Sequence, residues 1–363
     1  MNGNVAVDNL REVLEGERPR IVEVKTLESS EDAIRWDRFL ETCREATFFH
    51  RAGWKEVIDR AFHHDTYFLF AEVGGELQGV LPLGHINSYL FGNALISLPF
   101  CVQSGVAANS SAAHSALEKA ACELADSLGV DYLEMRNSHP CRLDWPSKSS
   151  LYVNFSKTIV SDPEANLRAI PRKQRAMIRK GIKAGLVAEI DEDIERFFKA
   201  YSESVRNLGT PVLSRHYFRT LKEVFKEACE ILTVTHNGQL VSSVMSFYFR
   251  DQVLPYYGGG TTLARHLKGN DFMYWEVLRR AGERGIRLFD YGRSKIGSGS
   301  YSFKKNWGFA PEPLYYEYYL VKAKNLPDVN PLNPKYRLFI ELWKRLPLPL
   351  SRVLGPLVAR HLG

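Results

Sequence analysis

The part of this sequence best suited to chemistry is a segment rich in glycine and lysine at residues 289–320. A strand is predicted to end near Asp290, and Gly292 then opens a loop that contains further glycines. Small residues at the end of a strand let backbone amides approach a ligand. We select from this segment the candidate binding residues Asp290, Arg293 and Lys305 and the candidate catalytic residue Lys304.

Aromatic side chains flank the two adjacent lysines of this segment. Phe303 precedes Lys304, and Trp307 follows Lys305 by two positions. A lysine held beside aromatic rings can stabilise an oxyanion or a phosphate. Asp290 is also a candidate base, although a strand-end aspartate more often caps the loop that follows it. The alternative interpretation is an ordinary loop followed by a final aromatic strand.

A second candidate is a basic run at residues 167–185, which contains seven cations and no acid. Pro171 fits the first position of a helix. In such a helix Arg172, Arg175 and Arg179 share one face, and Lys180 lies beside them. Like charges at this density repel one another, and a ligand with phosphates, such as tRNA, coenzyme A or a nucleotide-sugar, would neutralise them. The alternative is a solvated basic helix between two domains.

The third candidate segment contains three consecutive glycines, at 258–260. They follow an expected strand, and a helix is predicted to begin near Asn270 or Asp271, where free amides suit an anion. Tyr256 and Tyr257 directly precede the glycines, and we include both as candidate substrate contacts. Acetyltransferases bind the coenzyme A pyrophosphate at such a place through the pattern Q/R-x-x-G-x-G/A. The nearest stretches here, 265–270 and 103–107, are out of register, which counts against ordinary use of acetyl-CoA.

The elements that must position these segments follow the same order twice. In each half helices come first, then two apolar runs joined by a glycine turn, a further strand, a helix that stops at glycine, and another strand. The turns are at Gly74-Gly75 and at Asn237-Gly238, and the helix stops are Gly129 and Gly285. This repetition predicts two copies of one domain. Antiparallel hairpins with a helix between strands predict an α/β (α+β) fold with mixed sheets flanked by helices, consistent with two tandem acetyltransferase-like (GNAT) domains.

Composition supports an ordinary globular protein. The chain has 363 residues, 45% of them hydrophobic and 25% charged, with a net charge of +6. The five cysteines are scattered, so we expect reduced thiols and neither a disulfide framework nor a zinc site. The N-terminus has no apolar run, and no apolar stretch of about 18 residues occurs. We therefore expect a cytoplasmic protein with no metal and no bound cofactor.

The predicted organisation has five parts. They are a loose leader at 1–20, a first domain at 21–165, a basic interdomain helix at 166–190, a second domain at 191–322, and a Pro-rich linker with a basic amphipathic tail at 323–363. We expect the tail to pack onto the second domain. The alternative is a peripheral contact with the inner membrane through this tail.

These segments together resemble the Fem family, non-ribosomal aminoacyl transferases that use aminoacyl-tRNA and build peptidoglycan bridges. The resemblance covers roughly residues 35–322. It rests on the stretches 48–54, which ends at Trp54, 175–180, 273–284 and 303–309; the last resembles the family's Phe-Lys-x-x-(aromatic)-Gly motif. It implies two acetyltransferase-like domains, a transfer site at Phe303 and Lys304, and Trp54 as a substrate contact. The chain lacks the coiled-coil arm that some members have, which puts use of tRNA in doubt.

The sequences of 292–309 and of the 330–347 tail are closer still to those of the FemAB-like proteins of exosortase and PEP-CTERM systems. That resemblance implies an acceptor among cell-envelope or exopolysaccharide precursors rather than peptidoglycan.

The function expected from these observations is transfer of an activated acyl or aminoacyl group to an amine or hydroxyl. Aminoacyl-tRNA or acyl-CoA would be the co-substrate, and a glycan precursor or another molecule with phosphates would be the partner; no stable DNA binding is expected. One alternative is an acyl-CoA-dependent N-acyltransferase of the GNAT superfamily. The other is an adaptor without catalysis that binds a glycan or a nucleic acid.

Overall fold

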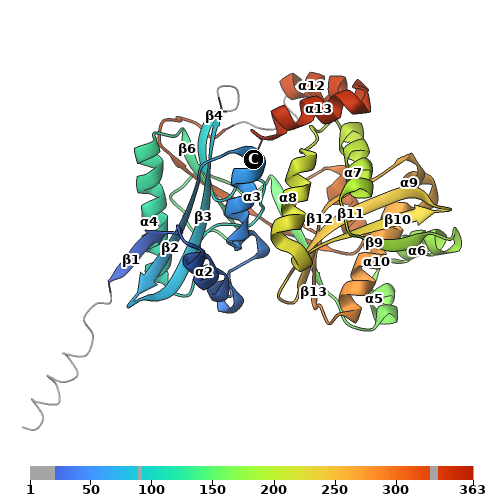
Figure 1. Cartoon of the computed structure of the whole chain (residues 1–363), viewed down its shortest axis with the longest axis horizontal. Helices are drawn as coiled ribbons and strands as arrows, with labels where there is room; N and C mark the ends of the chain where they lie inside the picture. Colours follow the sequence, from blue (N-terminus) through green and yellow to red (C-terminus); the bar gives the residue numbers. More distant parts are fainter. Residues whose placement is uncertain (1–20, 89–91, 328–333, 363) are drawn as a thin grey trace, which may run out of the picture.

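The computed structural model describes residues 21–88, 92–327 and 334–362. In this part of the chain two eight-stranded mixed sheets lie side by side, and helices cover their faces (Figure 1). The predicted α/β class with two mixed sheets flanked by helices is confirmed.

The first sheet has the strand order β1-β2-β3-β4-β6-β16-β7, and β5 pairs with β3. Its longest hairpin joins β2 to β3 at Gly74 and Gly75, both at positive φ, as the sequence predicted. The strands are β1 (Val22–Thr26), β2 (Thr66–Val73), β3 (Glu76–Ser88), β4 (Gly92–Ile96), β5 (Ala107–Ala108), β6 (Tyr132–Asn137), β7 (Ser147–Lys148) and β16 (Tyr315–Leu320).

The second sheet has the order β14-β8-β13-β12-β11-β10-β9, and β15 pairs with β8. Asn237 and Gly238, again at positive φ, turn β10 into β11. The strands are β8 (Tyr152–Thr158), β9 (Val187–Asp191), β10 (Cys229–His236), β11 (Gln239–Phe249), β12 (Gln252–Gly260), β13 (Leu288–Asp290), β14 (Ser294–Lys295) and β15 (Ala310–Pro313).

Two strands cross between the halves of the chain. β8, near the end of the range 21–165, pairs with β13 in the second sheet, and β16, at the end of the range 191–322, pairs with β6 in the first. The predicted ranges 21–165 and 191–322 therefore each give one strand to the other sheet. This exchange joins the two sheets through the backbone as well as through side chains.

The helices begin and end close to where capping residues and glycines predicted. α4 (Ser111–Leu128) stops at Gly129 and α7 (Glu195–Leu208) at Gly209, both in the left-handed region. The others are α2 (Ser30–Thr42), α3 (Gly53–Phe62), α5 (Pro163–Ala169), α6 (Arg172–Lys183), α8 (Arg215–Phe225), α9 (Thr262–Leu267), α10 (Gly269–Glu283), α11 (Gly299–Asn306), α12 (Pro334–Arg345) and α13 (Leu348–Ala359), with short 3-10 turns at Phe48–His50 and Lys226–Ala228.

One hydrophobic core runs through both halves. Phe48 of the first half stacks on Phe247 of the second with ring centroids 4.5 Å apart. Trp54 packs against Phe225 at 5.3 Å, and neither Phe48 nor Trp54 has measurable exposure. Burial of large aromatic rings on both sides of the boundary holds the two halves in one arrangement.

Three predicted segments take a different local structure from the one expected. The glycines at 258–260 lie inside β12 rather than in a free loop. Lys304 lies on the short helix α11 instead of on a loop. Residues 348–359 form α13 although they contain prolines. Pro349 lies in the first turn, where backbone N–H groups have no acceptor within the helix, so its missing N–H group costs no hydrogen bond.

Candidate functional site

A hollow of about 450 Å³ opens in the second sheet where two parallel strands separate. β12 and β13 pair through only two positions, Gln252 with Leu288 and Val253 with Phe289. β12 then continues along β11, whereas the chain after Asp290 turns toward β8. The space between the separating strands is lined by residues of β12, by the 291–293 turn and by α11.

Lys304 projects into this hollow from α11 and is 9% exposed. Its Nζ donates to the carbonyl oxygens of Gly292, at 2.9 Å, and Arg293, at 3.0 Å. The same nitrogen lies 5.5 Å from the ring centroid of Tyr291 and 5.7 Å from that of Phe155. Burial lowers the pKa of Lys304 from 10.5 to about 7, a value at which the amine exchanges protons near neutral pH.

Asp290 lies at the strand end that leads into this site. Its Oδ1 accepts from the Gly292 amide at 2.8 Å and from the Asn154 side chain at 3.0 Å. Burial raises the pKa of this carboxyl group, and the charge of Lys304 opposes the rise. The hydrogen bond to Gly292 is a loop cap, so in this structure Asp290 shapes the turn that carries the Lys304 acceptors.

Arg293 lies between the first hollow and a second one of about 240 Å³ in the first sheet. Its guanidinium donates to the Tyr316 hydroxyl at 2.9 Å and lies over the ring of Tyr152 at 4.6 Å. Within the described residues no carboxylate forms an ion pair with it. Arg136, which also lines the second hollow, is in contrast paired with Glu134 at 2.7 Å. Among the described residues Arg293 is thus a cation without a carboxylate partner at the border of the two hollows, a position that suits a ligand anion.

The two candidate tyrosines of β12 line the Lys304 hollow but use their hydroxyls within the protein. Tyr256 donates to the Phe100 carbonyl at 2.8 Å, a contact between the two halves. The hydroxyl of Tyr257 is 2.8 Å from that of Tyr217. These rings form rigid walls, so their surfaces rather than their hydroxyls face a bound group.

Tyr291 and Tyr274 belong to the same hollow, and sequence reasoning did not select them. Tyr291 is 3% exposed, and in the described part of the chain its hydroxyl has no hydrogen-bond partner. A Cβ atom at Gly258 would come within 3.1 Å of the Tyr274 hydroxyl, so this glycine keeps space open beside that group. The only sequence signal for Tyr291 is its position between Asp290 and Gly292, two residues that the sequence analysis had already singled out.

The other glycines of the 258–260 run serve packing. A Cβ at Gly259 would lie 2.7 Å from the Ala200 carbonyl, so the residue lets α7 approach β12. Gly269 is equally constrained, with Val241 at 2.3 Å from such a Cβ. The stretch 265–270, where a coenzyme A phosphate loop was sought, contains the end of α9 and the start of α10.

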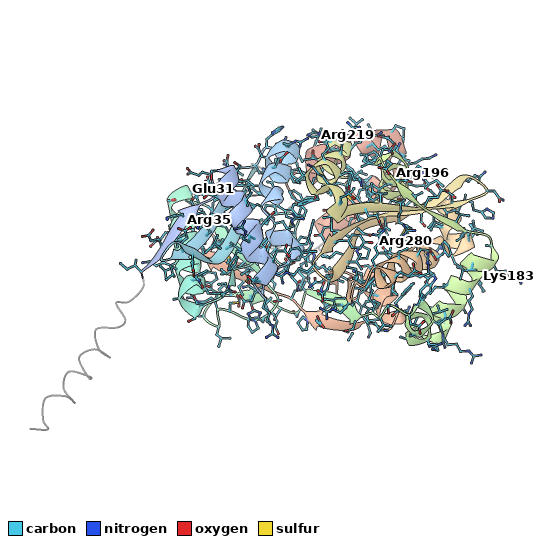
Figure 2. The ribbon with its side chains drawn as sticks, turned by 60° about the horizontal axis from the view of Figure 1, so that its bottom comes forward. Glu31, Arg35, Lys183, Arg196, Arg219 and Arg280 are labelled. Carbon is cyan, nitrogen blue, oxygen red and sulfur yellow. The ribbon has the colours of Figure 1, made fainter. Side chains whose placement is uncertain are left out.

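The basic run does not reach the Lys304 hollow. α6 packs against α10 at the outer edge of the second half, and Figure 2 shows Lys183 at the end of the molecule far from the first half. Arg172, Arg179 and Lys180 are exposed, and Arg175 donates to the Arg168 carbonyl at 3.3 Å. Among the described residues no carboxylate pairs with these four cations. They form an open basic strip on a face of their own.

Two further candidates lie outside the hollow, and Phe303 lies behind it. Trp54 is buried and donates to the Phe48 carbonyl at 3.1 Å, so its role here is packing and not the substrate contact we expected. Lys305 is exposed, with its nitrogen over the Tyr301 ring at 5.5 Å. Phe303 packs on Tyr274 and Tyr291 at 5.9 and 6.2 Å and so supports the ring that flanks Lys304.

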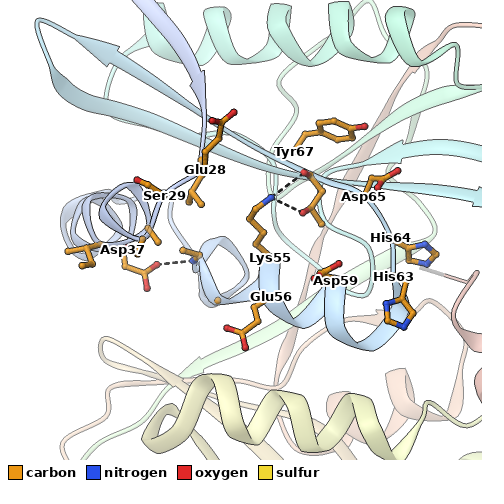
Figure 3. Close-up of a pocket in the computed structure, with 17 residues that line it drawn as sticks. Glu28, Ser29, Asp37, Lys55, Glu56, Asp59, His63, His64, Asp65 and Tyr67 are labelled. Atoms are coloured by element: carbon orange, nitrogen blue, oxygen red, sulfur yellow. Dashed lines mark hydrogen bonds between the residues drawn. The ribbon is translucent and has the colours of Figure 1, made fainter.

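A larger groove of about 980 Å³ lies in the first half between α2, α3 and β2 (Figure 3). Its polar groups already serve the fold: Asp37 accepts from the Ala52 amide at 2.8 Å, and Lys55 donates to the Thr66 hydroxyl at 3.2 Å. Its other charged side chains include the acids Glu56, Asp59 and Asp65. An acidic groove with satisfied donors suits a phosphate-bearing donor poorly, so we place the site at Lys304 despite the smaller volume.

Residues 168–305 match the sequence model of the acetyltransferase (GNAT) domain. This range contains α6, β12, β13 and most of α11, and so it holds Lys304 and Arg293. No curated protein sequence matches the chain.

Solved structures show the same architecture over most of the chain. FemX is 14% identical, covers 87% of this chain and 100% of its own, and has a TM-score of 0.66. A tandem GNAT protein from the clavulanic acid biosynthesis pathway is 14% identical, covers 84% of this chain and 100% of its own, and has a TM-score of 0.53. A conserved protein from Bacteroides thetaiotaomicron is 11% identical, covers 83% and 100%, and has a TM-score of 0.55. The chain therefore has a tandem GNAT fold, and its residues 168–305 match the acetyltransferase (GNAT) domain.

Proposed function

We propose that this protein is an acyl or aminoacyl transferase of the FemAB type whose reaction takes place beside Lys304. The observation that carries the proposal is a buried amine, with a pKa of about 7, at a hollow between the separating strands of an acetyltransferase-type domain. The likeness of the fold to FemX supports the FemAB type.

The proposed reaction joins an acceptor nucleophile to the donor carbonyl. An amine or hydroxyl of the acceptor attacks the carbonyl carbon of the donor ester or thioester, and negative charge develops on the carbonyl oxygen. The C–O or C–S bond of the donor then breaks, and the proton lost by the acceptor leaves with the donor's oxygen or sulfur. An ammonium group has three N–H donors. Two of those of Lys304 are used on Gly292 and Arg293, which leaves one to stabilise the oxyanion.

Two features favour an aminoacyl-tRNA donor over acyl-CoA. The stretch 265–270, where a coenzyme A phosphate loop was sought, ends α9 and begins α10 instead of forming a glycine loop. The strip on α6 offers exposed cations without carboxylate partners, which suits the phosphates of a polyanion. The cations lie far from Lys304, and a long donor such as tRNA has the length to contact both.

The proposed acceptor is an anionic cell-envelope or exopolysaccharide precursor, of the kind used in exosortase and PEP-CTERM systems. Arg293 borders both hollows, so an anionic group held there would place the rest of the acceptor toward Lys304. The ring of Tyr152 beside Arg293 lines the second hollow and is only partly buried, and a flat apolar surface of this type is one that sugars pack against.

An acyl-CoA-dependent N-acyltransferase is the second candidate. The match of residues 168–305 to the acetyltransferase domain and the likeness to the tandem GNAT protein favour it. It shares the Lys304 site and differs in the donor alone.

A thermal-shift panel followed by transfer assays separates the two candidates. Coenzyme A, acetyl-CoA, UDP-linked sugars and total tRNA are added to the purified full chain, because a ligand that binds the native state raises the melting temperature. A shift with tRNA and none with coenzyme A supports the FemAB type, and the reverse supports the N-acyltransferase. If Lys304→Met keeps full transfer activity with the donor so identified, the proposed site is wrong. Lys324→Met, at an exposed lysine outside the hollow, is the matched control.

A further inference from the structure

The C-terminal helices α12 and α13 both expose bulky apolar side chains to solvent. On α13 the exposed side chains follow the spacing of a single helical face. The exposed fractions are 66% for Leu338, 58% for Leu342, 43% for Leu350, 67% for Val353, 37% for Leu354 and 63% for Leu357. The pair lies together at the top of the molecule (Figure 1).

The buried face of α13 carries small residues instead. Ser351, Gly355 and Ala359 recur every four positions and are buried. A Cβ at Gly355 would lie 2.7 Å from the backbone of Val212, so this helix is held by close backbone approach. Its large aliphatic side chains point the other way. Ordinary surface helices bury their bulky face, so this reversed arrangement indicates a surface that is covered by another phase or partner.

The charge of this segment distinguishes between two candidates for what covers the α12–α13 face, a second copy of the chain and a lipid surface. Residues 334–363 contain six Lys or Arg and one acid, which gives a net charge of +5, against +6 for the whole chain. A second copy would bring an equally basic segment against this one, and like charges oppose that contact. An anionic lipid surface is complementary to both the charge and the apolar face.

We propose that the α12–α13 face binds the surface of an anionic lipid bilayer, with its leucines and valine among the headgroups and upper acyl chains. In the described residues no helix is long and apolar enough to cross a membrane, so the contact is with one leaflet. Apolar burial and lipid attraction act together, as in interfacial amphipathic helices.

The end of α13 reaches the candidate site. Ala359 and Leu362, at the end of α13, line the Lys304 hollow, and Leu362 also lines the hollow beside Arg293. The end of the helix is fixed to the first half: Arg360 donates to the Phe62 carbonyl at 2.7 Å, and its own carbonyl lies 2.7 Å from the His64 ring. If the proposed function holds, a docked protein would meet an acceptor that carries a lipid anchor; the docking itself does not depend on that function.

Vesicle co-sedimentation without any transfer substrate tests the docking. The full chain is mixed with vesicles of phosphatidylcholine alone or with added phosphatidylglycerol. We expect binding that rises with the phosphatidylglycerol fraction and weakens with salt. Val353→Glu with Leu357→Glu should weaken it by roughly tenfold or more, because both side chains would then place charge in the interface. Ile34→Glu with Leu143→Glu, at sites 61% and 94% exposed elsewhere, should bind as the parent does.

Two further measurements keep the test decisive. Melting curves of the variants must match that of the parent. Lys344→Gln with Arg345→Gln, which leaves the apolar face intact, should reduce the dependence of binding on phosphatidylglycerol.

Failure of the parent to bind either vesicle, or an equal loss of binding in the Ile34 and Leu143 control pair, overturns the proposal. So does a dimer in sedimentation velocity that the Val353 and Leu357 changes abolish, because the face would then cover a second copy. Loss of transfer activity with intact vesicle binding would count against the proposed function alone.

Discussion

The Nζ atom of Lys304 lies 3.0 Å from the carbonyl oxygen of Arg293, so the candidate catalytic amine also holds the backbone of the candidate anion-binding residue. The side chain of Arg293 contacts Tyr152 and Tyr316 at the second hollow. One short turn therefore connects the place where charge would develop with the place where an anionic substrate would bind. A change at either residue is expected to affect both transfer and binding.

Lys304→Met should reduce the transfer rate by about 100-fold or more, the usual effect of removing an oxyanion donor. It should also cost about 1–3 kcal/mol of unfolding free energy, because the two partly buried carbonyl groups of Gly292 and Arg293 lose their donor. Single-turnover kinetics and denaturant unfolding give the two numbers.

Lys305→Met is the matched comparison, since this neighbour is exposed and outside the hollow. We expect a rate within about twofold of the parent, as for a surface change away from the site. A loss as large as that of Lys304→Met would show that the sequence-based choice of Lys305 was sound and that the hollow is misplaced.

The transfer rate should fall as pH rises through about 7, because the Lys304 ammonium, with its pKa near 7, then loses the charge that stabilises the oxyanion. Lys304→Arg keeps its charge and should remove this descending limb whatever its absolute rate.

The contribution of Lys304 to the unfolding free energy should instead increase as pH rises. The pKa of Lys304 is lower in the fold than its ordinary 10.5, so the unfolded chain binds more protons between these values, and the Lys304 contribution to unfolding free energy rises over that range. Denaturant unfolding at several pH values should show a smaller rise for Lys304→Met.

Arg293→Gln should raise the KM for the acceptor more than it lowers kcat, by roughly tenfold or more, because a guanidinium–anion contact is lost at the border of the two hollows. Arg293→Lys should recover part of the affinity, since the charge returns without the fork geometry. Equal loss in kcat with an unchanged KM would assign Arg293 to the transition state instead.

Arg179→Gln with Lys180→Gln should weaken tRNA binding and make it less sensitive to salt, with a slope of log K against log salt smaller by about one to two, because fewer counterions are released. Exchange of Lys119, which is 78% exposed on α4, for Gln provides the control. If both variants bind tRNA with the parent's slope, the strip on α6 is only a solvated helix face.

Trp54→Ala should lower the unfolding free energy by about 3–5 kcal/mol, because a buried indole that packs between the halves is removed. The folded fraction should keep the parent's KM. A raised KM with unchanged stability would restore the substrate contact expected from the resemblance to the Fem family.

The sequence alone determined the features that depend on a few neighbouring residues. Gly129, Gly285 and the Gly74-Gly75 turn have positive φ where the sequence predicted helix stops and a turn, because few residues adopt that conformation. The two mixed sheets followed from the repeated order of hydrophobic runs and turns, and the Phe303–Phe309 stretch pointed to the lysine that lies in a hollow of the fold.

Only the tertiary structure decided which distant residues share a site. Tyr152 lies over Arg293 because β8 crosses into the second sheet, a pairing between segments far apart in the chain. Long-range packing likewise buried Trp54, moved the α6 cations to an outer edge, and turned the bulky face of α13 outward. The local pattern of residue types encodes the backbone conformation of an element and its apolar face. Which elements pack together depends on the complementary shapes of segments far apart in the chain, and no single stretch of sequence specifies those shapes.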